Sequence, residues 1–194
     1  MKLLSAQNIT YSINENKLFH NLSFDINSGD GLHIKGGNGS GKSTLLRIIL
    51  GITSPSKGFV ETHAQDLNIS YLGHKNAIKN YLTPLENLEL LFNDAELKIA
   101  FEWLRKFGLF DLQDELTASL SYGQQKKLAL IRVLARSSDL IILDEPLVGL
   151  DQATADQLTS FLIQKLSEGV SLILTSHINP MIDCRVLDIG ANDA

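Results

Sequence analysis

A glycine-rich stretch between Gly36 and Ser43 has residue types that can enclose an anion. It reads Gly-Gly-Asn-Gly-Ser-Gly-Lys-Ser and fits the pattern G-x-x-x-x-G-K-[ST] without a gap. Glycines let backbone N–H groups turn inward around phosphate oxygens, where a Cβ atom would clash. Lys42 can reach the β- and γ-phosphates of a nucleotide, and the Ser43 hydroxyl is a hard oxygen ligand for Mg²⁺. If a strand precedes the stretch and a helix follows it, it predicts a site for ATP with Mg²⁺.

Two adjacent carboxylates, Asp144 and Glu145, follow the apolar run Leu140-Ile141-Ile142-Leu143. Successive strand residues point in opposite directions, so the two acids should have different tasks. Asp144 suits the coordination of Mg²⁺, as in other phosphate-loop enzymes. Glu145 is the candidate general base that orients and polarises an attacking water. Taken alone, the pair could also be two acids at the surface end of a strand; the upstream phosphate loop favours the catalytic interpretation.

A further candidate site begins at Ser121, in the stretch Leu120-Ser121-Tyr122-Gly123-Gln124-Gln125-Lys126. Ser121 and Gln124 have the spacing of a capping box, which satisfies N–H groups at the start of a helix. The simpler interpretation is a well-capped helix and nothing more. A helix N-terminus with free N–H groups is also an anion site, so both interpretations can hold.

The elements that must position these residues alternate between strands and helices at both ends of the chain. We expect strands at 3–11, 18–26, 32–34, 58–61, 67–72, 140–143, 170–175 and 185–189, and helices at 43–50, 121–136 and 152–166. Between residues 83 and 108 apolar residues recur at helical spacing, with Ile99, Trp103 and Phe107 as one series. The predicted fold is α/β: a mostly parallel sheet core, an antiparallel β region and an inserted helical subdomain. We predict one domain over 1–194, with the core at 1–74 and 121–194 and the helical subdomain at 75–120.

The composition argues against several classes of protein. The 194 residues are 44% hydrophobic and 20% charged, which is ordinary for a globular domain. A net charge of −5, without a block of basic residues, argues against direct nucleic-acid binding. Cys184 is the only cysteine, so we expect neither an intrachain disulfide nor a thiolate-rich metal site. We identify no signal peptide, and the apolar runs fall short of the ~20 residues that span a bilayer. We therefore expect a cytoplasmic protein that meets the membrane only through a partner.

The ordered set of motifs resembles the ABC ATPases. The stretch from Leu120 to Gln124 looks like the LSGGQ signature of that family, and Val148-Gly149-Leu150-Asp151 resembles the D-loop, which meets its counterpart across a dimer. His177 resembles the switch histidine that contacts the γ-phosphate. Tyr11 stands where the family usually places an aromatic residue that stacks on adenine. The resemblance covers nearly the whole chain and implies a P-loop NTPase fold of the ABC ATPase type.

This resemblance implies an ATPase whose active site is shared between two copies of the chain. In one copy Ser43 and Asp144 would hold the metal, and Glu145, His177 and Lys42 would act in catalysis. The signature of the other copy would close over the γ-phosphate, so that ATP binding joins the homodimer and hydrolysis releases it. The residues that the resemblance assigns to the nucleotide are Tyr11, Gly36, Gly37, Asn38, Gly39, Ser40, Gly41, Lys42, Ser43, Thr44, Ser121, Gly123 and Gln124.

Two positions depart from the family pattern. Tyr122 replaces the usual small residue of the signature, where it would crowd the contact with the other copy. The Q-loop, expected after the strand at 67–72, has Gly73-His74 where a glutamine normally stands. An amide oxygen suits Mg²⁺ better than imidazole does, which puts a metal-ligand role for His74 in doubt.

The second departure narrows the resemblance. Tyr71-Leu72-Gly73-His74 and the run Leu82-Thr83-Pro84-Leu85-Glu86-Asn87-Leu88 are similar to the ATP-binding subunits of the bacterial haem exporter of cytochrome c biogenesis, the CcmA family. The implied partner is an integral membrane subunit, CcmB or one like it, docked near residues 74–87 on the cytoplasmic side of the inner membrane. The implied task is haem delivery, or release of a haem chaperone, on the periplasmic side. No Cys-x-x-Cys-His motif is present, and the ATPase need not touch its cargo.

Three alternatives stay open from the sequence. One is an ABC ATPase that exports another substrate. Another is a non-transport ABC protein acting on DNA or ribosomes, although such proteins usually carry coiled-coil insertions or tandem ATPase domains. The third is a module that dimerises on ATP without turnover, against which Glu145 and His177 argue.

Overall fold

The larger of two sheets in the computed structural model, which describes residues 1–13, 16–177 and 179–190, is parallel. Its strand order is β5-β6-β7-β3-β8, and every adjacent pair is parallel. The strands are β3 (Gly31–Lys35), β5 (Ile69–Leu72), β6 (Leu140–Asp144), β7 (Ser171–Thr175) and β8 (Arg185–Asp188). The predicted parallel core is therefore confirmed.

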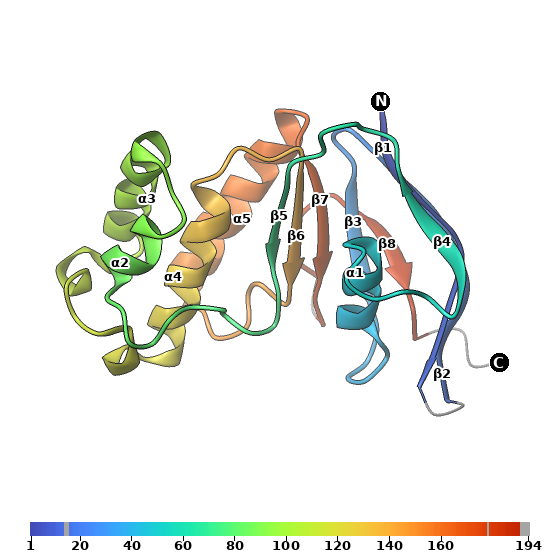
Figure 1. Cartoon of the computed structure of the whole chain (residues 1–194), viewed down its shortest axis with the longest axis horizontal. Helices are drawn as coiled ribbons and strands as arrows, with labels where there is room; N and C mark the ends of the chain where they lie inside the picture. Colours follow the sequence, from blue (N-terminus) through green and yellow to red (C-terminus); the bar gives the residue numbers. More distant parts are fainter. Residues whose placement is uncertain (14–15, 178, 191–194) are drawn as a thin grey trace.

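The smaller sheet is antiparallel, with the order β2-β1-β4. Its strands are β1 (Lys2–Ile13), β2 (Asn16–Asn27) and β4 (Lys57–Thr62). Figure 1 shows helix α1 (Lys42–Ile49) between this sheet and the parallel one. The remaining helices are α2 (Pro84–Glu89), α3 (Asp94–Lys106), α4 (Tyr122–Leu134) and α5 (Gln152–Ser167), with short 3₁₀ turns at Phe110–Leu112 and Thr117–Ser119.

Alternate residues of β6 serve the cores on the two faces of the parallel sheet. Leu140 and Ile142 join the cluster formed with α1 and the antiparallel sheet. Ile141 and Leu143 join the cluster formed with α4 and α5. Because a strand covered on both faces buries every side chain, it reads as a continuous apolar run, as the sequence of β6 does. Because the side chains of β6 are packed on both faces, its last residue, Asp144, is held at the carboxyl edge of the sheet.

The helical segment is organised by caps. Thr83 caps α2 and Asn93 caps α3, each in a complete capping box, and Pro84 occupies the first turn of α2. Leu88 of α2 and Leu104 of α3 belong to the same buried cluster as α4 and β6. The segment 75–120 thus shares its core with the rest of the chain, and its description as a subdomain stays a prediction.

One sequence expectation needs correction. Ile99, expected on one buried face with Trp103 and Phe107, is exposed because it borders an open hollow between α3 and α5. Cys184 immediately precedes β8 and is partly buried against Gly31. None of the helices described is long and apolar enough to cross a membrane.

Candidate functional site

The phosphate loop connects β3 to α1, which is the context that the glycine pattern requires. Gly41 is the N-cap of α1 with a φ of 95°, and no side chain caps this helix, so its first N–H groups stay open to an anion. A Cβ at Gly41 would lie 3.0 Å from the Phe19 ring, and a Cβ at Gly36 would overlap the Ser40 hydroxyl. Both glycines therefore leave space for neighbouring side chains, and Gly41 also adopts a conformation that favours glycine.

Lys42 and His177 both approach one carboxylate oxygen of Glu145. Lys42 is only 6% exposed, and its Nζ donates to the carbonyl oxygens of Gly36 and Gly37 at 2.9 and 3.0 Å. The same Nζ lies 3.6 Å from Oε1 of Glu145. The His177 Nε2 atom lies 2.8 Å from that oxygen. The structure thus brings together the three predicted catalytic residues.

Thr175 links the two acids, a role that sequence reasoning missed. This fully buried residue ends β7 opposite Asp144. Its hydroxyl donates to Oδ1 of Asp144 at 2.7 Å and accepts from the Glu145 backbone N–H at 2.9 Å. The link holds Glu145 at a φ of 50°, a left-handed conformation that costs about 1 kcal/mol in a residue with a side chain. The available signal was a hydroxyl residue at the carboxyl end of an apolar strand next to the acid-bearing strand.

The donor set around Ser43 and Asp144 fits Mg²⁺. The Asp144 Oδ2 atom is buried and has no hydrogen-bond partner among the described residues, which suits an oxygen reserved for a cation. Ser43 and Asp144 line one hollow together with His74 and Tyr71. Ser43 and Asp144 would hold the ion, and its charge would offset that of the phosphate groups. His74 contributes an exposed side chain to the same hollow.

A second hollow, of about 410 Å³, lies over the phosphate loop. It is lined by Ile13, Leu18, Asn38, Gly39, Gly41, Lys42, Ser43, Thr44, His74 and Glu145. Tyr11 does not line it; its ring packs against Phe19 with centroids 6.2 Å apart. The adenine-stacking role of Tyr11 therefore stays a prediction. Ile13 and Leu18 are apolar residues of the site that sequence reasoning missed.

The signature forms the start of α4, and its capping box is present. The Gln124 N–H donates to the Ser121 hydroxyl at 3.3 Å, and the Ser121 N–H donates to Oε1 of Gln124 at 2.8 Å. Ser121 is exposed, and neither it nor Gly123 nor Gln124 lines the hollow over the phosphate loop. Within one chain the structure does not bring these three residues to the phosphate loop.

Burial shifts two ionisable groups near the acids. Lys126 on α4 is 2% exposed, and burial lowers its pKa, although the charges of Asp144 and Glu145 favour its protonated form. Burial raises the pKa of Tyr71, and the Asp144 charge adds to this rise. A buried cation behind two carboxylates offsets part of their mutual repulsion. Burial of Lys126 could not be predicted from the sequence, because its neighbours Gln124, Gln125 and Lys127 are polar.

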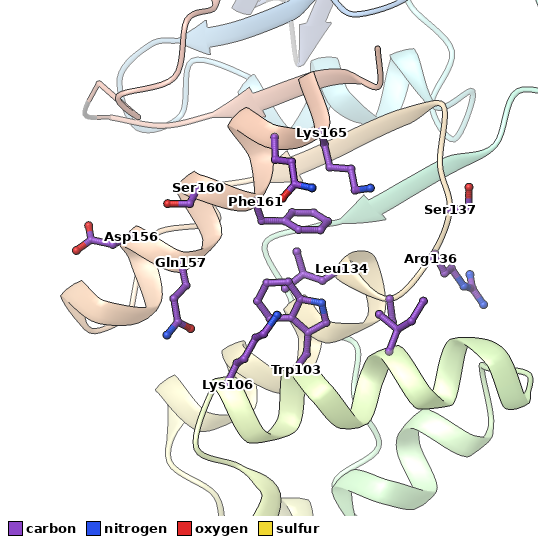
Figure 2. A pocket seen from close by; sticks show the side chains of 13 residues that line it. Trp103, Lys106, Leu134, Arg136, Ser137, Asp156, Gln157, Ser160, Phe161 and Lys165 are labelled. Atoms are coloured by element: carbon purple, nitrogen blue, oxygen red, sulfur yellow. The ribbon is translucent and has the colours of Figure 1, made fainter. Parts of the chain in front are cut away.

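A larger hollow of about 790 Å³ lies elsewhere, between α3, the end of α4 and α5 (Figure 2). Trp103 and Phe161 meet edge to face within it, and Lys106 and Lys165 lie over their rings. It shares no lining residue with the hollows at the phosphate loop. No sequence motif predicted it.

Comparison with known proteins agrees with this geometry. The family described as ABC transporter matches residues 19–148. The cytochrome c biogenesis ATP-binding export protein CcmA of Escherichia coli K12 is 37% identical over 186 residues, covering 91% of this chain and 90% of that protein. The CcmA of Idiomarina loihiensis is 38% identical over 186 residues, covering 90% and 85%. A dimeric ATP-binding cassette in a post-hydrolysis state, bound to ADP and Pi, superposes with a TM-score of 0.77 at 27% identity, covering 91% of this chain and 88% of that one. The chain belongs to the ABC transporter family, as an ABC-type ATPase homologous to the CcmA proteins of cytochrome c biogenesis.

Proposed function

We propose that two copies of the chain enclose two molecules of MgATP and drive an integral membrane subunit similar to CcmB, in haem export for c-type cytochrome biogenesis. In this proposal the ATPase is peripheral, on the cytoplasmic side of the bacterial inner membrane. It binds no nucleic acid and meets the membrane only through its partner. The relatives named as cytochrome c biogenesis export proteins support this task.

One observation carries the homodimer: the signature residues lie away from the phosphate loop of their own chain. The Tyr122 and Gly123 N–H groups at the start of α4, which the capping box does not use, suit a γ-phosphate bound to a second copy. Exposed apolar side chains flank that surface, with Tyr122 at 54% and Val148 at 49% exposure. Such groups are expected where a partner covers them.

The contacts of Glu145 support a mechanism in which nucleotide frees the base. In the structure its carboxylate is held by Lys42 and His177. A γ-phosphate carries more negative charge than the carboxylate, so the Lys42 ammonium and the His177 ring would turn to it. Glu145 could then hold the attacking water and accept its proton, while the open N–H groups of α1 stabilise the phosphate charge. Ser43 and Asp144 would hold Mg²⁺ in this arrangement.

The membrane partner would dock on the segment 74–87 and the adjacent α2. Tyr81 and Leu90 are exposed there at 70% and 60%. His74 lines the hollow that contains Asp144 and lies at the start of this segment, so a partner's movement would reach the metal site directly. In this proposal residues 75–120 act as the helical subdomain of a single ATPase domain.

The test of the homodimer is Glu145→Gln. We expect this variant to bind ATP, to form a stable dimer on size-exclusion chromatography with light scattering, and to lose nearly all turnover. Normal hydrolysis by the variant would overturn the assignment of the base. A variant that stays monomeric in saturating ATP, in the presence of its membrane partner, would overturn the shared site.

The test of the task is the membrane protein that co-purifies with the tagged chain from its host. A subunit of the CcmB type would support haem export. A different integral membrane subunit would redirect the proposal to another cargo. Sedimentation with DNA or ribosomes at physiological salt would contradict both.

A further inference from the structure

The signature departs from its family pattern at Tyr122, and the structure shows where this bulky side chain lies. The ring is partly exposed, and one part of it packs on Gly149 of the D-loop in the same chain. A Cβ added to Gly149 would lie 2.6 Å from Cε1 and 3.0 Å from Cδ1 of Tyr122. Contacts that close do not occur between real side chains, so the ring occupies the space that any larger residue at 149 would need.

Two further contacts join the same segments. A Cβ added to Gly123 would lie 3.0 Å from the carbonyl oxygen of Gly149, so the two backbones also approach closely. Lys127 on α4 makes an ion pair of 2.7 Å with Asp151, which in turn caps α5 through the Thr154 N–H. We refer to Tyr122, Gly123, Lys127, Gly149 and Asp151 as the signature–D-loop junction. The Lys127 ammonium and these hydrogen bonds hold the pKa of Asp151 well below its usual range, so the ion pair persists at neutral pH.

We propose that Tyr122 and Gly149 are a matched pair of positioning residues, whose contact makes the signature and the D-loop of one chain act as one unit on the nucleotide held by the other. The inference rests on the proposed homodimer. A flat ring with two side-chain torsions loses little entropy when it packs on a glycine, so the contact stiffens the junction at low cost. The contacting atoms are ring carbons, so the hydroxyl of Tyr122 is not needed.

The glycine is required for two separable reasons. Its φ is 81°, a conformation that L-residues rarely adopt. Its missing Cβ also leaves room for the ring. Gly149→Ala introduces both costs, whereas the same change with Tyr122→Ala introduces the backbone cost alone. A double-mutant cycle therefore separates the ring contact from backbone strain.

The experiment measures ATPase activity, with the membrane partner present, for Tyr122→Ala, Gly149→Ala, the double variant and Tyr122→Phe. We expect losses of about 5-fold for Tyr122→Ala and about 10-fold for Gly149→Ala, and a loss of about 10-fold in the double variant rather than the ~50-fold of independent effects. Tyr122→Phe should keep at least half of the activity. Because the residues at 122 and 149 are exposed, all variants should fold, which thermal unfolding checks.

Two outcomes overturn the pair. One is a double variant whose loss equals the product of the single losses, because the two positions would then act independently. The other is full activity of Tyr122→Ala. ATP-dependent dimerisation of each variant in a Glu145→Gln background keeps the two proposals apart. If Glu145→Gln dimerises normally while the cycle is multiplicative, the matched pair fails and the homodimer stands; if Glu145→Gln alone does not dimerise, the homodimer fails first.

Discussion

The phosphate-loop region and the signature region of the chain differ in their burial and in the contacts that hold them. The first gathers Lys42, Glu145 and Asp144 at the carboxyl edge of a sheet buried on both faces, where each charge has a partner or a place for one. The second is the exposed start of one helix, held by a capping box and by the D-loop. The first region is therefore assembled within one chain, whereas the second is placed to meet another copy in the proposed homodimer.

The two regions should therefore tolerate substitutions differently. Buried polar groups are costly when left unpaired, so the phosphate-loop region can tolerate few substitutions. Exposed capping groups can be satisfied by water, so the signature region loses little stability when altered. Variants in the first region should therefore damage binding and stability together, whereas variants in the second should damage turnover with little effect on folding.

The largest expected effect is that of Lys42→Ala on nucleotide binding. Removing the ammonium takes away a charge-assisted bond to phosphate and leaves Glu145 facing the nucleotide without a cation, so ATP affinity should fall by about 100-fold. Titration calorimetry measures the change. Lys57→Ala, on the exposed strand β4, is the matched control and should bind as the parent does. Unchanged affinity in Lys42→Ala would remove the lysine from the site.

A second test replaces Thr175 by valine, which keeps the shape but removes the hydroxyl. Asp144 Oδ1 and the Glu145 N–H would lose their partner, and kcat should fall by about 10- to 100-fold with a higher Mg²⁺ requirement. Thr175→Ser should restore kcat to within about 3-fold, because the hydroxyl returns.

The matched control is Thr117→Val, which also removes a fully buried hydroxyl that pairs with Asn87 far from the acids in sequence. It should lower the melting temperature but leave kcat unchanged. Equal losses of kcat in the two valine variants would reduce Thr175 to a structural residue.

A smaller effect is expected at the signature. Ser121→Ala should cost about 1 kcal/mol in the free energy of unfolding and about 10-fold in ATPase activity, because the cap and a donor to the partner's γ-phosphate are lost together. Asn93→Ala removes the equivalent cap of α3, in which Asn93 Oδ1 accepts from the N–H groups of Ala95 and Glu96, and no site lies nearby along the chain. It should match the stability loss while keeping full activity. If both variants keep full activity, Ser121 serves only as a cap.

The smallest effect concerns a thiol. Burial and the charge of Asp183 raise the pKa of Cys184 to about 11. At pH 8 the thiol is almost entirely protonated, so alkylation should be about 100-fold slower than for an ordinary cysteine and should accelerate as pH rises toward 11. A cysteine introduced at exposed Ala118, beside the signature, is the comparison and should react fast. Equal rates at the two positions would contradict the raised pKa of the Cys184 thiol.

The chemistry of the site could be read from the sequence because it sits on regular elements. The glycine spacing predicted the turn between β3 and α1, and the continuous apolar run predicted a central strand ending at Asp144. Ser121 and Gln124 predicted the start of α4, since a capping box depends on neighbours in sequence alone. These are local signals.

Contacts between residues that are distant in the sequence could not be predicted from it. Thr175 and Asp144 meet only because β6 and β7 are adjacent and in register. Tyr122 meets Gly149 through the path of the chain between α4 and α5, and Lys126 is buried by packing rather than by its sequence neighbours. Tyr11 was placed by analogy, and its strand is irregular in register near that residue.

Helix α4 packs in the core cluster shared with α2 and β6, and its N-terminus carries the signature. Leu128 and Ile131 pack in the same cluster as Leu88 of α2 and Leu143 of β6. A close-packed core passes displacement along rather than absorbing it. A displacement of α2 would therefore be transmitted through that cluster to α4, whose N-cap is Ser121.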